Sequence, residues 1–115
     1  MRYLFLAYQD ETQLAGLSAS ERNTFENACR ASDELLRQSG YLHAMEHLQS
    51  SRTATTVRVL NGPVSVADGP LSETNEQLTG LFFVNARDLN EAIQVASKMP
   101  QAGRGPIEVR PILEF

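Results

Sequence analysis

The chain has 115 residues, of which 42% are apolar and 21% are charged. This composition is typical of one globular domain, here residues 1–115, and excludes disordered, collagen-like and repeat proteins. The formal net charge is −4, with 10 Lys and Arg against 14 Asp and Glu, and no run of basic residues occurs. Nucleic acid and anionic membrane surfaces are therefore not expected partners, because both require a concentrated positive surface.

The cysteine content and the first residues bear on location. The single Cys29 cannot form an internal disulfide, and no Cys or His spacing resembles a structural zinc site. The apolar run at residues 3–8 is too short for a signal peptide or a membrane span. We expect a cytoplasmic protein that holds no metal ion or other cofactor.

The first half of the chain predicts a strand, a long helix and a second strand. Residues 3–8 form a buried strand with two apolar faces, and residues 11–17 form a loop or a short helical turn. Ser18 and Glu21 form a capping box at the start of the helix, which Gly40 ends in the left-handed conformation. The apolar stripe of this helix comprises Phe25, Ala28, Cys29, Ser32, Leu35 and Leu36. Its wetter side comprises Arg22, Glu26, Arg30, Asp33, Glu34 and Arg37.

The second strand spans residues 41–48, and the polar residues 49–53 form a loop. Residues 54–60 and 64–66 form a β-hairpin, because Asn61-Gly62 is a strong turn signal. Residues 68–74 form a loop, and residues 80–84 a strand with two apolar faces. A second helix begins at an Asp88 cap and stops at Pro100, with the apolar stripe Leu89, Ala92, Ile93, Ala96 and Met99. After a loop at 101–106, residues 107–113 form the last strand.

This order of strands and helices predicts an α+β ferredoxin-like sandwich, with both helices on one face of a mainly antiparallel sheet. The strands at 3–8 and 80–84 nevertheless carry apolar side chains on both faces. An uncovered second face would expose an apolar patch of several hundred Å², which soluble monomers seldom tolerate. We therefore expect a homodimer that pairs through the sheet face.

The stretch DGPLSETNEQL at residues 68–78, followed by Gly80-Leu81-Phe82, resembles the signature of the YCII-related family, specifically its DGPF branch. The resemblance extends to YLFLAY at 3–8, TTVR at 55–58, DLNEA at 88–92 and IEVRP at 107–111. It implies a dimeric α/β barrel and bacterial cytoplasmic proteins whose biochemical role is mostly unassigned. Leu71 stands where that branch usually has Phe, and Asn75 where it commonly has Lys.

More distant members of that family carry a His and Asp pair proposed to be catalytic, with the His near the first helix. The helix that begins after Ser18 contains no His here, so the resemblance transfers no mechanism. His47 is the better acid or base candidate, since an imidazole can change charge near neutral pH; the alternative is a solvated His at a strand end. Asp68 is a candidate general base or ligand acceptor; the alternative is an acceptor of backbone N–H groups that fixes its turn.

Four further residues are candidate ligand contacts. Glu73 and Glu76 would share one face of a helical turn, where they could do acid or base work or simply follow a Ser72 or Thr74 cap. Arg58 could bind a carboxylate or phosphate, or pair with an acidic neighbour, and Tyr8 could offer a phenol. His43 and His47 would lie about 13 Å apart in a strand, too far to share a metal ion.

Two function classes remain open from the sequence. The first is a small-molecule binding protein, in which a lyase- or isomerase-like activity could reside, with a site between sheet and helices near Asp68, Glu73, His47 and Arg58. The second is a non-catalytic regulatory or interaction module without a ligand. An enclosed pocket lined by these polar residues would favour the first.

Overall fold

The computed structural model describes residues 1–114. Two short 3-10 helices, η1 (Ser51–Thr53) and η2 (Pro100–Gly103), accompany the regular elements. In chain order these are β1 (Arg2–Asp10), α1 (Glu11–Ala15), α2 (Ala19–Gln38), β2 (Leu42–His47), β3 (Thr55–Val59), β4 (Val64–Asp68), β5 (Glu76–Asn85), α3 (Leu89–Ser97) and β6 (Ile107–Pro111).

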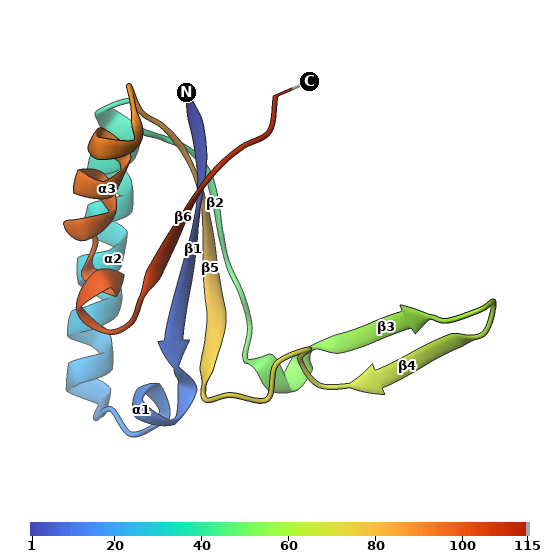
Figure 1. Ribbon diagram of the computed structural model, residues 1–115. Coiled ribbons are helices and arrows are strands. Elements are labelled where there is room, and N and C mark those ends of the chain that lie inside the picture. Colours follow the sequence, from blue (N-terminus) through green and yellow to red (C-terminus); the bar gives the residue numbers. More distant parts are fainter. Residues whose placement is uncertain (115) are drawn as a thin grey trace.

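Four strands form the main sheet in the order β2-β5-β1-β6, and each neighbouring pair is antiparallel. The helix α2 connects β1 to β2, and α3 connects β5 to β6, so the chain contains two interleaved βαβ units. Both helices lie on the same side of the sheet (Figure 1). The predicted α+β ferredoxin-like fold is therefore confirmed.

The core lies between the sheet and the helices. Along β1, Tyr3, Phe5 and Ala7 are buried, whereas the alternate residues are only partly buried. The buried residues pack with Phe82 and Val84 of β5 and with apolar residues of α3. On the other side, the open face of the sheet consists of Leu4, Leu6 and Tyr8 of β1 with Leu81 and Phe83 of β5. The two apolar faces predicted for β1 and β5 are present.

The capping box of α2 is confirmed. The Ser18 hydroxyl accepts from the Glu21 amide at 3.1 Å, and the Glu21 carboxylate accepts from the Ser18 amide at 3.1 Å. Hydrogen bonding of the Glu21 carboxylate to Ser18 holds the pKa of that carboxylate below its usual value. Gly40, with φ of +82°, follows the helix end in the left-handed conformation, as predicted.

The buried faces of both long helices differ from the predicted stripes. On α2 the buried residues are Cys29 and Asp33, while Leu35 is 63% exposed, so the placement of Asp33 on the wetter side was wrong. On α3 the exposed residues include Leu89 and Ile93, while Val95 is buried with Ala92, Ala96 and Met99. The rotation of each helix about its axis depends on its packing against the sheet. The spacing of apolar residues in the sequence gives no information on that packing.

The predicted hairpin is also confirmed, and it projects from the main sheet on the side opposite the helices (Figure 1). Asn61 and Gly62 both have positive φ, 54° and 106°, the requirement of a type I′ turn. We call residues 55–68 the arm. Its register pairs Val57 with Val66 and Val59 with Val64, so four valines share one face of the arm, each at least 59% exposed.

The segment that leads to β5 differs from its prediction. The strand begins at Glu76 rather than near residue 80, because Glu76 and Gln77 pair with Asp10 and Gln9 at the end of β1. Residues 70–75 contain bends but no helix, so Glu73 and Glu76 do not share a helical face. The strand pairing with β1 overrides the local capping pattern.

Candidate functional site

The structure contains a hollow of about 1080 Å³ on the helix side of the sheet, which we call the main cleft. One wall is the first half of α2, and the opposite wall is formed by the end of β2 with residues 48–52. The loop at 73–75 and η2 contribute further lining. Its sheet-side lining includes Ala7, Gly80 and Phe82, so apolar groups of β1 and β5 lie beneath the polar walls.

Asp33 and His47 meet across this cleft. Oδ2 of Asp33, on α2, lies 3.4 Å from Nε2 of His47, at the end of β2. The Asp33 side chain is nine-tenths buried, whereas the His47 side chain is 52% exposed. A buried carboxylate that contacts an accessible imidazole is an arrangement that can orient the ring for proton transfer.

The sheet supports the His47 ring from one side. His47 lies opposite Gly80 in the β2 and β5 register. Its ring meets Phe82 edge to face, with ring centroids 5.8 Å apart. A Cβ at Gly80 would approach the Phe82 ring to 3.1 Å, so the glycine leaves space that this pair of rings uses. The imidazole is therefore held between a carboxylate and an aromatic ring.

Two buried oxygen atoms that belong to residues lining this cleft are unpaired. Oδ1 of Asp33 and Oε1 of Gln101 are buried and accept no hydrogen bond from any residue within 1–114. Gln101 is 97% buried in η2, where its carbonyl accepts from the amides of Arg104 and Gly105 at 3.0 and 3.1 Å. Unpaired buried acceptors are rare in folded proteins, so two in one cleft mark it as a place for hydrogen-bond donors.

The segment after α3 holds Gln101 in place by a close backbone approach. A Cβ at Gly105 would lie 2.1 Å from the carbonyl oxygen of Tyr8 in β1. The neighbouring Tyr8 amide donates to the Pro106 carbonyl at 3.0 Å. Only glycine can occupy position 105 with this path, and the path presses η2 against the sheet next to the cleft.

Ionic side chains line the rim with both signs. Glu11, at the start of α1, accepts from the amide and hydroxyl of Ser51 at 2.7 and 2.6 Å and so joins α1 to η1. Arg22 donates to the Leu14 carbonyl at 2.9 Å, and Arg30 donates to Asn27 at 3.5 Å. Neither arginine forms an ion pair with the buried Asp33 within residues 1–114.

Cys29 lies one helical turn before Asp33 and also lines the cleft. Burial, followed by the negative charges of Asp33 and Glu26, raises the pKa of its thiol from 9.0 to about 11. The thiol is therefore protonated at neutral pH and is a poor nucleophile. This agrees with the interpretation of Cys29 as a buried structural residue.

Among the residues predicted to act together, the structure separates Asp68 from His47. Asp68 is the last residue of β4, lies opposite Thr55, is exposed, and stands outside the walls of the main cleft. Its carboxylate accepts no hydrogen bond within residues 1–114, so the turn-fixing alternative is wrong. The Gly69 amide instead donates to the Ala54 carbonyl at 2.8 Å, and the Thr56 hydroxyl donates to Gly69 at 2.9 Å.

The four residues predicted as ligand contacts do not line the same hollow. Glu73 lines the main cleft with His47. Tyr8 and Glu76 line a different hollow, of about 1080 Å³, between the base of the arm and the sheet. The Tyr8 hydroxyl there donates to Glu108 at 3.5 Å. Arg58 is exposed in the middle of β3, opposite Ser65, and lines neither hollow.

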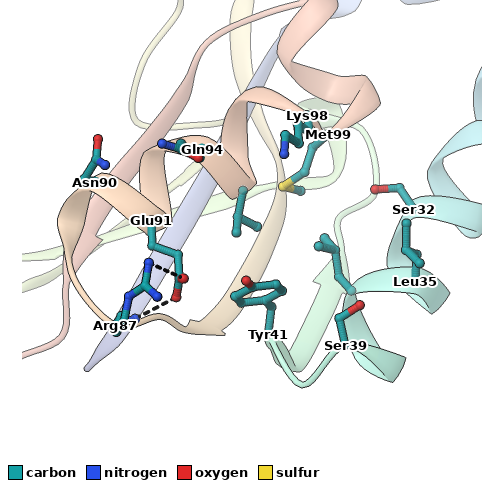
Figure 2. Close-up of a pocket in the computed structure, with 12 residues that line it drawn as sticks. Ser32, Leu35, Ser39, Tyr41, Arg87, Asn90, Glu91, Gln94, Lys98 and Met99 are labelled. Atoms are coloured by element: carbon teal, nitrogen blue, oxygen red, sulfur yellow. Dashed lines mark hydrogen bonds and ion pairs between the residues drawn. The ribbon is translucent and has the colours of Figure 1, made fainter.

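A smaller hollow of about 300 Å³ lies between α2 and α3 (Figure 2). Figure 2 shows Tyr41 and Met99 facing it, with Arg87 and Glu91 at one end. These two side chains form an ion pair with a nitrogen to oxygen distance of 3.0 Å. No buried unpaired polar side chain within residues 1–114 lines this hollow, so it offers less for a ligand to recognise than the main cleft.

Two features of residues 1–114 bear on other classes of site. No three His, Cys, Asp or Glu side chains lie close enough together to hold a metal ion. None of the helices combines the length and the apolar character needed to cross a membrane.

The sequence prediction missed Asp33 and Gln101, which carry the unpaired buried oxygens among the polar residues of the cleft. A signal existed for Asp33, because it follows Cys29 by four residues and so lies on the same side of α2. No local signal existed for Gln101, which reaches the cleft from the far end of the chain.

The comparisons with known proteins agree on one family. A family model described as the YCII-related domain matches residues 1–115. An uncharacterised protein of Rhizobium meliloti (strain 1021) is 32% identical over 114 residues, which is 97% of this chain and 92% of that protein. The resemblance drawn from the sequence is thus confirmed at the level of the family, and the chain belongs to the YCII-related family.

Proposed function

We propose that this YCII-related protein binds a small organic molecule in the main cleft, with Asp33 and His47 as the central polar contacts. The observation that carries the proposal is the state of the Asp33 carboxylate, which is nine-tenths buried, contacts His47 through one oxygen and has its other oxygen unpaired. Burial of a carboxylate is costly, so an incompletely paired one beside a large cleft is a mark of function. The cleft is also large enough for a metabolite.

Proton transfer is the chemistry that this pair can perform. His47 is half-exposed in the cleft, so its ring nitrogens can reach a ligand, while Asp33 orients the ring from behind. In such a reaction His47 is the acid or base and Asp33 is a positioning residue. A reaction that moves a proton on a bound molecule fits the lyase or isomerase class.

We also propose that two copies of the chain pair through the open face of the sheet. The chain exposes 7886 Å², roughly 1,700 Å² more than the roughly 6,200 Å² expected of a compact monomer of its mass. Its Cα radius of gyration is 16.0 Å, against about 13 Å for a compact chain of this length. Part of the exposed surface is apolar, since the four valines of the arm have no cover of their own.

A second copy suits this surface better than an unrelated partner. The open face and the valine face of the arm both belong to every copy, so a two-fold dimer can cover them at once. This homodimer would cover the exposed valine face of the arm. The chain then need not be a non-catalytic interaction module to explain that face. The buried, protonated thiol of Cys29 is compatible with the bacterial cytoplasm that we propose as its location.

A thermal-shift screen against a metabolite library tests the binding proposal. We expect one or more compounds to raise the melting temperature of the wild-type protein but not that of His47→Gln, because a bound ligand stabilises the folded state. His43→Gln is the matched control, since His43 is exposed on the same strand and lies outside the cleft. A library that leaves the wild-type melting temperature unchanged, or hits that His47→Gln retains in full, would overturn the proposal.

A further inference from the structure

Two unpaired acceptors belong to residues that line the main cleft, and they indicate the kind of ligand. Oδ1 of Asp33 and Oε1 of Gln101 are the buried side-chain atoms within residues 1–114 that lack a hydrogen-bond partner, and both residues line this one cleft. They reach it from α2 and η2, which are distant in sequence. A carboxylate oxygen can only accept, so the group that satisfies Asp33 must donate.

The charges around Asp33 restrict the chemical class of the donor further. Asp33 contacts an imidazole through Oδ2, but no Lys or Arg lies within ion-pair distance of either of its oxygens within residues 1–114. Arg22 and Arg30 are bonded elsewhere, and Arg52 is exposed. A bound carboxylate or phosphate would bring a like charge to this buried oxygen, and a hydroxyl would supply a donor without a counter-charge. A protonated amine supplies both a hydrogen-bond donor and a positive charge.

We propose that the ligand of the main cleft carries a protonated amine that donates to the Asp33 carboxylate, with the Gln101 side chain as a further acceptor. This inference rests on the proposed binding function and adds the chemical class of the ligand. The sheet side of the cleft, at Ala7, Gly80 and Phe82, suits a short apolar skeleton attached to the amine. Charge-assisted donation to a buried carboxylate is stronger than donation between neutral groups, so the amine dominates recognition.

Three probes with a shared skeleton test the inference: 2-phenylethylamine, 2-phenylethanol and 3-phenylpropionate. Their dissociation constants are measured at pH 7 by NMR titration of the full chain, and shifted resonances locate the binding site. We expect the amine to bind at the cleft at least about tenfold more tightly than the alcohol or the carboxylate.

Two variants link the amine to Asp33. Asp33→Asn should weaken amine binding about tenfold, because it removes the charge and keeps the shape. Glu26→Gln is the matched control, since Glu26 is an exposed acid on the same wall of the cleft, and it should change the affinity less than about twofold. Gln101→Met provides a second test that does not depend on the folding of Asp33→Asn, and it should weaken amine binding several-fold.

The outcomes separate this inference from the proposed function. Equal binding of the amine to the wild type and Asp33→Asn, tighter binding of the alcohol or the carboxylate, or no amine binding at millimolar concentration would overturn the inference. The binding function would survive each of these results if the metabolite screen still yields ligands whose effect His47→Gln abolishes. Failure of that screen as well would overturn both.

Discussion

Nε2 of His47 lies 3.4 Å from Oδ2 of Asp33, which joins the end of β2 to the middle of α2. His47 is the one residue within 1–114 that contacts this carboxylate through a hydrogen bond. The contact therefore has a structural role in addition to the proposed chemical one, and removal of the imidazole leaves the Asp33 carboxylate without a partner.

We expect His47→Ala to lower the free energy of unfolding by about 1 kcal/mol, because a mostly buried acceptor then loses its bond. His43→Ala, on the same strand but exposed and without a side-chain hydrogen bond within residues 1–114, should leave it unchanged. Urea denaturation of the two variants and the wild type measures the difference. Identical midpoints for all three proteins would show that the contact contributes nothing to stability.

The proposed dimer predicts a particle of twice 12.7 kDa in multi-angle light scattering. Phe83→Asp should give the monomer mass, because Phe83 lies on the open face of the sheet opposite Leu4 and a carboxylate there cannot be buried against a second copy. Leu35→Asp is the control, since Leu35 is 63% exposed on the helix side, and it should keep the dimer mass. A wild-type protein that elutes with the mass of one chain would contradict the pairing.

Gly105→Ala should lower the free energy of unfolding by about 2 kcal/mol, because the new Cβ would lie 2.1 Å from the carbonyl oxygen of Tyr8 and the backbone must move. Gly103→Ala should have little effect, since a Cβ there meets no atom within 4 Å. Thermal unfolding of both variants tests the contrast. Equal stability of the two would mean that η2 is not pressed against β1 as described.

Cys29 should react slowly with iodoacetamide at pH 8 in the folded protein. Its pKa is raised from 9.0 to about 11, so the thiolate fraction at pH 8 is about a hundredfold smaller than in the unfolded chain. The folded-state rate should increase as the pH rises toward 11, whereas the urea-unfolded chain should reach its plateau near two pH units lower. Mass spectrometry of the alkylated protein gives both rates, and equal rates at pH 8 would refute the raised pKa.

Part of this molecule could be predicted from neighbouring residues alone. The alternation of Tyr3, Leu4, Phe5 and Leu6 predicted a strand with two apolar faces, and Asn61-Gly62 predicted the hairpin turn. These features depend on backbone conformation and on side-chain order within a few residues, which a sequence displays directly. The β α β order predicted the fold, and the resemblance at residues 68–78 predicted the family whose model matches residues 1–115.

The site depended on the tertiary structure. The rotation of α2 against the sheet decided that Asp33 is buried, and the path of the last third of the chain brought Gln101 to the same cleft. The separation of the arm from the sheet decided that Asp68 does not join His47. Each of these facts is a contact between segments far apart in the chain, and such contacts follow from packing energies summed over the whole molecule. The local periodicity of a sequence therefore cannot predict these contacts.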